Sequence, residues 1–141
     1  MNRRDALKIA AVAALGTSVA NAYDTKLLYN KNDMKIMDPA KPTKAELKHL
    51  PEIKIGAKDA KGYSLIEVNI GQAGIIHPSD PTHWIYEIEL FANKKSVSTV
   101  SLEPVISRGF LATRVKLDEV QILTAVSKCN LHGNYTASIK V

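Results

Sequence analysis

The single cysteine of the chain, Cys129, stands three residues before His132 in the stretch SKCNLHGNY. A thiolate and an imidazole at this spacing can bind the same metal ion. Asn130 and Gly133 give the stretch the composition of a turn, which predicts exposed rather than packed side chains. One cysteine excludes an internal disulfide. The alternative for Cys129 is a free buried cysteine that packs as a small apolar side chain.

Three further histidines extend this candidate site: His49, His77 and His83. His77 and His83 bound the segment HPSDPTH, which has two prolines and no apolar residue. His49 lies in KHLP, before the first strand expected in the core. All the histidines therefore fall in loops or at strand ends, and the loops of a β-sandwich can cluster at one end. Taken singly, each would more often be a surface or a hydrogen-bonded core residue.

Four imidazoles and one thiolate are more donors than a closed tetrahedral zinc site uses, and the mixture also suits copper or iron. A blue-copper site usually adds an axial methionine shortly after the last histidine. The methionines are Met1, Met34 and Met37, and none of them follows His132. This absence argues against copper.

Short segments rich in β-branched and aromatic residues predict the strands that position these side chains. Residues 64–70 place Ile66, Val68 and Ile70 on one face. Residues 83–91 place Trp84 and Tyr86 on the apolar face and Ile85 on the opposite one. Further strands are expected at residues 52–56, 97–103, 110–117, 120–128 and 134–141. About seven short strands predict an all-β fold, an antiparallel β-sandwich.

The first 22 residues have the composition of a secretory signal peptide. The basic start NRRDALK is followed by the apolar run IAAVAALGTSVA and by an A-x-A cleavage site that ends at Ala22. The arginine pair at residues 3–4, with Leu7 and Lys8, resembles a twin-arginine signal, which exports folded proteins. Ala6 stands where that signal usually has phenylalanine, so general secretion is the alternative. Either route predicts a periplasmic protein.

The net charge and the distribution of basic and apolar residues limit the classes of partner that we expect. The formal net charge is +5 and falls to +3 without the first 22 residues, and no basic cluster is interleaved with aromatic residues. We therefore expect no binding to nucleic acid. No further apolar run is long enough to span a bilayer, so no stable membrane insertion is expected. Residues 23–43 are polar and lysine-rich and predict an extended arm, and residues 44–141 predict one domain.

Three motifs carry a family resemblance. HPSDPTHWI at residues 77–85 and CNLHG at residues 129–133, preceded by KHLP at residues 48–51, resemble superoxide reductase, the family of neelaredoxin and of the desulfoferrodoxin iron domain. The resemblance covers roughly residues 44–141 and implies an immunoglobulin-like β-sandwich. The cysteine-rich amino-terminal module of desulfoferrodoxins is absent from the sequence, which implies the one-iron type.

The resemblance implies one mononuclear non-haem iron that cycles between Fe2+ and Fe3+. Cys129 would be its axial ligand and the sixth position would be open to superoxide, which is reduced to hydrogen peroxide. The equatorial ligands would be His49, His77, His83 and His132. The iron would be reduced again by an external one-electron donor, such as a rubredoxin-like or cytochrome protein. A homo-oligomer is compatible with the family.

Lys48 and Glu46 flank the first of these histidines. Lys48 would attract the superoxide anion and help to order a proton-donating water; the alternative is a solvated surface lysine. The family often has a glutamate directly before this lysine, which can bind oxidised iron, but Leu47 stands there. Glu46 is the nearest acid, and the sequence TKAE predicts that it forms a helix capping box with Thr43. Both observations argue against a carboxylate ligand to oxidised iron.

Two other functions stay open. One is a non-catalytic electron-transfer or iron-binding protein on the same sandwich, which would need a blocked sixth position. The other is an immunoglobulin-like binding module whose histidines are incidental. Five potential ligands in the spacing of the family argue against the binding module.

The signal peptide gives a direct test. Replacing the pair by Arg3→Lys and Arg4→Lys should leave precursor in the cytoplasm, because the twin-arginine route depends on the arginine pair. Fractionation of cells that express both forms, followed by immunoblotting, measures the exported share. Unimpaired export of the lysine variant would mean that the chain uses general secretion.

Overall fold

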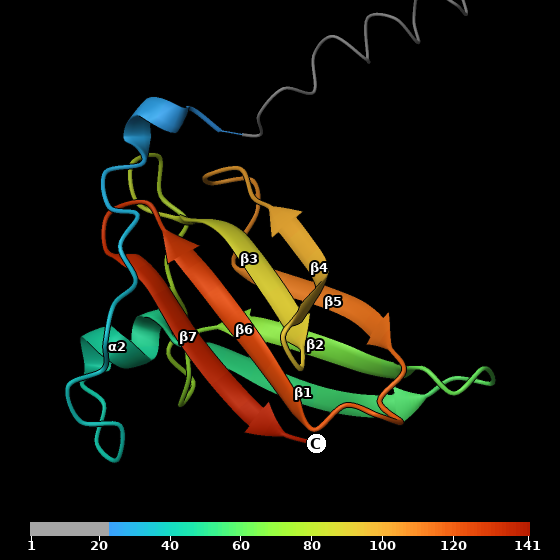
Figure 1. Ribbon diagram of the computed structural model, residues 1–141. Helices are drawn as coiled ribbons and strands as arrows, with labels where there is room; N and C mark the ends of the chain where they lie inside the picture. Colours follow the sequence, from blue (N-terminus) through green and yellow to red (C-terminus); the bar gives the residue numbers. More distant parts are fainter. Residues whose placement is uncertain (1–22) are drawn as a thin grey trace, which may run out of the picture.

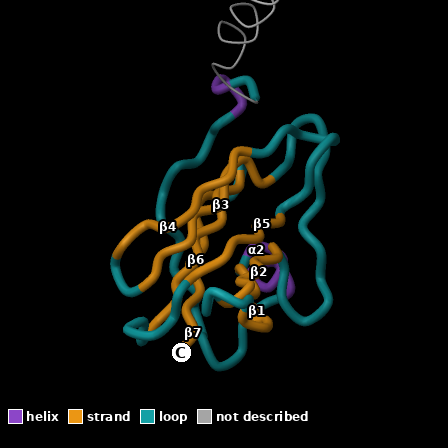
Figure 2. Tube along the Cα trace, turned by 90° about the vertical axis from the view of Figure 1, so that its right-hand side faces the viewer, coloured by secondary structure: helices purple, strands orange, loops and turns teal. Residues whose placement is uncertain are grey.

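The computed structural model describes residues 23–141, and the signal peptide predicted for residues 1–22 lies outside them. Within the described part, seven strands form two antiparallel sheets (Figure 1). One sheet has the strand order β1-β2-β5 and the other has the order β4-β3-β6-β7. Figure 2 shows the sandwich from the side, with the strands of the two sheets in separate layers. The predicted all-β sandwich is confirmed.

All the segments predicted as strands form them. Their bounds are β1 (Pro51–Lys58), β2 (Ser64–Ile70), β3 (Ile85–Ala92), β4 (Lys95–Ser101), β5 (Phe110–Val115), β6 (Ile122–Cys129) and β7 (Gly133–Lys140). No predicted bound differs from the observed one by more than two residues. The content of β-branched and aromatic residues was therefore a reliable guide to these elements.

The hydrophobic core lies between the two sheets. Along β2, Ile66, Val68 and Ile70 are buried while the residues between them are half-buried. The facing sheet contributes fully buried side chains from β3 and β6: Ile88, Leu90, Leu123 and Ala125. Because alternate residues of a strand point to opposite faces, each sheet offers one apolar face to the other. This packing fixes the strand ends from which the loops emerge.

Strand β3 departs from the predicted alternation near its start. Its pairing with β6 shifts register between Ile85 and Glu87, as in a β-bulge. Ile85 therefore joins the core, and its predicted place on the opposite face was wrong. Trp84 and Tyr86 instead pack against Tyr23, with ring centroids 6.1 and 5.4 Å away. A strict period of two cannot anticipate the extra residue of a bulge.

The short helix α2 (Lys44–His49) brings His49 to the sandwich. The Thr43 hydroxyl accepts a hydrogen bond from the backbone N–H of Glu46 at 3.2 Å. In return, the Glu46 carboxylate accepts one from the backbone N–H of Thr43 at 2.7 Å. This reciprocal pair is the capping box that the sequence predicted. It fixes where the helix begins, and therefore which residue ends it beside β1.

Residues 23–43 precede the sandwich and contain η1 (Thr25–Leu27) but no strand of either sheet. The chain runs from η1 past the turn between β6 and β7 to α2 (Figure 1). An isolated parallel bridge joins Asp33 to Asn134 at the start of β7. The division of the chain into an arm and a domain stays a prediction. In residues 23–141, no helix is long and apolar enough to cross a membrane.

Candidate metal centre

The five predicted ligands lie on a helix, a strand and two connections at one end of the sandwich. His49 ends α2, and Cys129 ends β6. The other three lie in the connections that precede β3 and β7: His77, His83 and His132. The sandwich therefore gathers residues that are up to 83 positions apart in the sequence.

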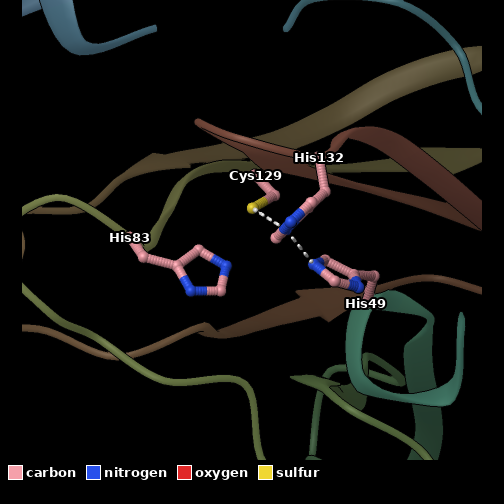
Figure 3. A group of neighbouring side chains, drawn as sticks. All are labelled: His49, His83, Cys129 and His132. Atoms are coloured by element: carbon pink, nitrogen blue, oxygen red, sulfur yellow. Dashed lines mark hydrogen bonds between the residues drawn. The ribbon is translucent and has the colours of Figure 1, made fainter. Parts of the chain in front are cut away.

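Four of these residues form a compact group (Figure 3). His49, His83, Cys129 and His132 each offer a ligand atom, and these atoms all lie within 4.8 Å of one another. Nδ1 of His132 lies 3.1 Å from Nε2 of His49 and 3.6 Å from Sγ of Cys129. Distances of this size suit donors that share one ion, because metal–nitrogen and metal–sulfur bonds are about 2.0–2.3 Å long.

His77 completes a ring of imidazoles. Its ring centroid lies 4.7 Å from that of His49 and 4.7 Å from that of His83. His132 closes the other side, with 4.9 Å to each of the same two rings. The centroids of His49 and His83 are 6.3 Å apart, which is the length expected of a diagonal in a nearly square arrangement. Neighbouring rings are inclined by 67–79°.

Hydrogen bonds of His49 and His77 determine which nitrogen of each ring is unprotonated. Nδ1 of His49 lies 2.7 Å from the carbonyl oxygen of Ala45, and Nδ1 of His77 lies 2.7 Å from that of Pro78. A carbonyl oxygen can only accept, so each Nδ1 carries the proton and donates it. Nε2 of both rings is therefore an unprotonated electron-pair donor, in the orientation typical of metal-binding histidines.

Two buried nitrogen atoms test whether the residues fit a metal ion. Nε2 of His77 and Nε2 of His83 are shielded from solvent and have no hydrogen-bond partner among residues 23–141. A buried polar atom without a partner costs roughly 1–3 kcal/mol. Both atoms belong to rings of the square arrangement, and a cation at its centre would satisfy them. The donor set fits a mononuclear iron, which accepts imidazole and thiolate ligands.

Burial keeps the imidazoles neutral. It is the largest cause of the shift that lowers the pKa of His49 to about 4 and that of His77 to about 3, and the nearby imidazoles contribute to the same shift. Burial also lowers the pKa of His83. Neutral imidazoles at physiological pH are the form that binds a metal, so no proton has to be removed from these rings first.

Cys129 is fully buried, and this burial raises the pKa of its thiol. The backbone N–H groups of His132 and Leu131 oppose the shift by hydrogen bonding to the sulfur, and the charge of Lys48 opposes it as well. A cation at the centre would favour the thiolate much more strongly. In a metal-loaded site, the cation and these backbone donors would together favour the thiolate.

The structure places Lys48 and Glu46 differently. The half-buried Lys48 lies close enough for its charge to act on four of the five donors, namely His49, His77, His83 and Cys129. Both carboxylate oxygens of Glu46 accept backbone hydrogen bonds, from Met37 at 3.0 Å and from Thr43 at 2.7 Å. These bonds lower the pKa of Glu46. They hold its carboxylate at the start of α2, whereas the ligand His49 is at the end.

Three supporting residues were not found from the sequence. The hydroxyl of the buried Ser127 donates to the carbonyl oxygen of His49 at 2.5 Å, which ties α2 to β6. The ring of Tyr135 stacks on His49, with centroids 4.7 Å apart and planes inclined by 19°. The third is Asn130, whose fully buried side chain bonds to three backbone groups. Its position in the motif C-N-x-H is the sequence feature from which this role could have been inferred.

The expectation of an exposed turn is confirmed for His132, which is exposed, but was wrong for Cys129 and Asn130. Cys129 and Asn130 are both fully buried, although the turn residues around them suggested exposure. Residues 23–43 cover this turn from outside, and a local composition rule contains no information about a segment about 100 positions away in the chain.

Comparison with known proteins identifies the family. The sequence profile of the family described as Desulfoferrodoxin matches residues 41–138. The chain belongs to the desulfoferrodoxin family. The desulfoferrodoxin of Desulfarculus baarsii is 33% identical over 119 residues, which are 84% of this chain and 84% of that protein. The desulfoferrodoxin of Nitratidesulfovibrio vulgaris is 34% identical over 107 residues, covering 74% of this chain and 72% of that protein.

Solved structures agree with this membership. The superoxide reductase (1Fe-SOR) of Giardia intestinalis is 26% identical, with a TM-score of 0.58, and the match covers 67% of this chain and 98% of that one. The superoxide reductase (neelaredoxin) of Ignicoccus hospitalis is 28% identical, with a TM-score of 0.55, over 66% of this chain and 79% of that one. The family fold is therefore the sandwich described above.

Burial of neutral histidines predicts how the stability of the metal-free protein depends on pH. In the unfolded chain His49 and His77 have pKa values near 6.5, and in the folded chain near 4 and 3. Below about pH 6.5 the unfolded state therefore binds more protons, so acid favours unfolding. The free energy of unfolding should fall by about 1.4 kcal/mol per pH unit for each histidine, from about pH 6.5 towards pH 5.

Urea unfolding in the presence of a chelator, between pH 7.5 and pH 5, measures this slope above the range in which carboxylates titrate. His49→Gln keeps a neutral polar side chain. It should remove about one proton from the difference in proton binding between the unfolded and folded states, and so reduce the slope by about 1.4 kcal/mol per pH unit. A free energy of unfolding that stays constant over this range in the unmodified chain would contradict the burial of neutral imidazoles.

Proposed function

We propose that this chain is a superoxide reductase, which reduces superoxide to hydrogen peroxide. The observation that carries the proposal is that the donor atoms of His49, His83, Cys129 and His132 all lie within 4.8 Å of one another. The ring of His77 lies beside those of His49 and His83. These donors stand in the motif order of a family whose structural relatives include superoxide reductases. The oxidoreductase family supports an enzyme, and the reaction of this chain is our inference from the site.

The ligands determine what chemistry the centre can do. An iron ion held there would supply one electron to superoxide as it changes from the ferrous to the ferric state. The four imidazoles are neutral donors and Cys129 is the only anionic one, so the ligands cancel a single positive charge. The Cys129 thiolate donates electron density, and the backbone N–H groups of Leu131 and His132 moderate this donation.

Lys48 supplies the charge for attracting the substrate. Its positive charge acts on the ring of His83 and on Cys129, and we expect it to act also on a superoxide anion that approaches the centre. A local positive charge raises the rate of encounter with an anion, and salt screens this effect. The ammonium group can also help to order a proton-donating water for the reduced product.

The partners and the location complete the proposal. One electron is consumed per superoxide, so the centre needs an external one-electron donor, such as a rubredoxin-like or cytochrome protein. The amino-terminal sequence supports action in the periplasm after export, and a homo-oligomer is compatible with the family.

Stoichiometry separates the proposed reaction from the alternatives. Protein purified anaerobically and loaded with ferrous iron should consume one superoxide and form one hydrogen peroxide per iron, without releasing dioxygen. A donor should then restore the ferrous state and allow further turnover. A non-catalytic electron carrier would consume no superoxide, and a dismutase would release dioxygen; either result would refute the proposal.

Removal of the thiolate should abolish the reaction but not the fold. Cys129→Ser replaces a strong electron donor by a hydroxyl, which is not a comparable ligand. We expect loss of the sulfur-to-iron absorption band of the oxidised protein and of most reductase activity. Circular dichroism should show an unchanged β-sandwich. A variant that kept both its visible band and its rate would show that Cys129 is not a ligand.

Lys48 and Glu46 should differ in their effect on the encounter with superoxide. Lys48→Ala should slow this step by roughly tenfold or more and weaken its dependence on ionic strength. Glu46→Ala should leave the step nearly unchanged and cost at most about 1 kcal/mol of stability through the lost capping box. Pulse radiolysis across a salt series measures both rates.

Two outcomes would change this assignment. Equal rates and equal salt dependence in Lys48→Ala and the unmodified protein would make Lys48 an ordinary surface residue. A large rate effect of Glu46→Ala, or a shift of its ferric spectrum, would show that the carboxylate leaves the helix cap and reaches the iron.

A further inference from the structure

The segment at residues 27–34, which we call the strap, lies before the region that matches the family profile, residues 41–138. It nevertheless contacts the turn that carries Cys129 and His132. The backbone N–H groups of Tyr29 and Asn30 donate to the carbonyl oxygen of Asn130 at 2.9 and 3.2 Å. The strap thus binds the residue that directly follows the thiolate ligand.

The strap continues along the start of β7. The backbone N–H of Met34 donates to the carbonyl oxygen of Asn134 at 2.9 Å, and the N–H of Asn134 donates to that of Asn32 at 2.8 Å. Gly133 lies directly beneath it, with φ of +90°, and a Cβ there would be 2.6 Å from the carbonyl oxygen of Asn32. Backbone therefore packs on backbone, and no side chain at position 133 would fit between them.

The side chain of Asn130 joins the strap to a second ligand segment. Its Nδ2 donates to the carbonyl oxygens of Leu27 in the strap and of Thr82, at 3.1 and 2.8 Å. Its Oδ1 accepts from the backbone N–H of Trp84 at 2.9 Å. Thr82 and Trp84 flank the ligand His83 on either side. One fully buried amide therefore connects the strap, the segment of His83 and the turn of Cys129.

The planarity of one peptide group links the strap to the sulfur. The carbonyl of Asn130 and the N–H of Leu131 belong to the same rigid plane and point in opposite directions. The strap holds the oxygen at one end, and the N–H at the other end hydrogen-bonds to Sγ of Cys129. A peptide whose carbonyl accepts hydrogen bonds is polarised and becomes a better donor.

We propose that the strap is a positioning element of the metal centre: it orients the peptide between Asn130 and Leu131, and so sets the hydrogen bond to the Cys129 sulfur, the metal affinity and the reduction potential. Asn130 is the positioning residue through which it acts. This inference rests on the iron site of the proposed function but not on superoxide as the substrate.

Proline substitutions in the otherwise unchanged full chain test it, because proline has no N–H to donate. The double variant Tyr29→Pro/Asn30→Pro removes both donors to Asn130. The matched control, Lys35→Pro/Ile36→Pro, places two prolines in the same arm at positions whose N–H groups donate no hydrogen bond within residues 23–141. Both variants and the unmodified chain are loaded with ferrous iron.

We expect the Tyr29→Pro/Asn30→Pro variant to bind iron roughly tenfold or more weakly, the usual effect of losing a support of a ligand. Its reduction potential should be lower, because a thiolate with a weaker hydrogen bond donates more strongly and stabilises the ferric state. Its sulfur-to-iron band should shift, and the control should match the unmodified chain. Asn130→Ala should change the potential and the band in the same way.

A strap that only stabilises the fold would give a different pattern. The Tyr29→Pro/Asn30→Pro variant would then unfold at lower urea while its potential, band and iron affinity stayed unchanged, and this result would overturn the inference. If Asn130→Ala does not fold, the proline variants still distinguish a positioning element from a segment that only stabilises the fold. An unmodified chain that binds iron but does not reduce superoxide refutes the proposed function alone, whereas failure to bind iron refutes both.

Discussion

The structure depends on the placing of five electron-pair donors side by side in a mostly buried space. Nε2 of His49 and Nδ1 of His132 are 3.1 Å apart and share a hydrogen bond, whereas Nε2 of His77 and of His83 have no partner within residues 23–141. Buried polar atoms without partners are costly. A cation at the centre would bond to these atoms, so we expect folding and metal binding to be thermodynamically coupled.

The β-sandwich makes this arrangement possible because its strands fix the positions of the loops at their ends. Cys129 and Gly133 pair across the end of the β6–β7 hairpin, and Ile85 pairs with Cys129 across the neighbouring strand. The Ser127 hydroxyl holds α2 against the same sheet. The core between the sheets sets the positions of the strands, and the strands set the distances between the donors.

Much of the fold and of the candidate site could be predicted from the sequence. Richness in β-branched and aromatic residues located all the strands. Alternation of apolar residues supported two of them, residues 64–70 and 83–91, because burial of one sheet face imposes a period of two. TKAE located the start of α2, because its cap is formed by residues three apart. The candidate ligands could be proposed because imidazole and thiolate are chemically distinctive and lie in recognisable motifs.

The rest depends on contacts that local sequence does not encode. The bulge in β3, the burial of Cys129 and the stacking of Tyr135 on His49 follow from the way distant segments meet. Asn130 looked like a turn residue, yet its amide bonds to residues about 50 and 100 positions away. A polar residue at a turn and a polar residue in a buried network have the same sequence signature.

A crystal structure of the iron-loaded protein, with diffraction collected at the iron absorption edge, tests the central claim most directly. We predict a single anomalous peak that is bonded to His49, His77, His83 and His132 and to the sulfur of Cys129. Iron bound elsewhere, or iron at this position without the Cys129 sulfur among its ligands, would contradict the account.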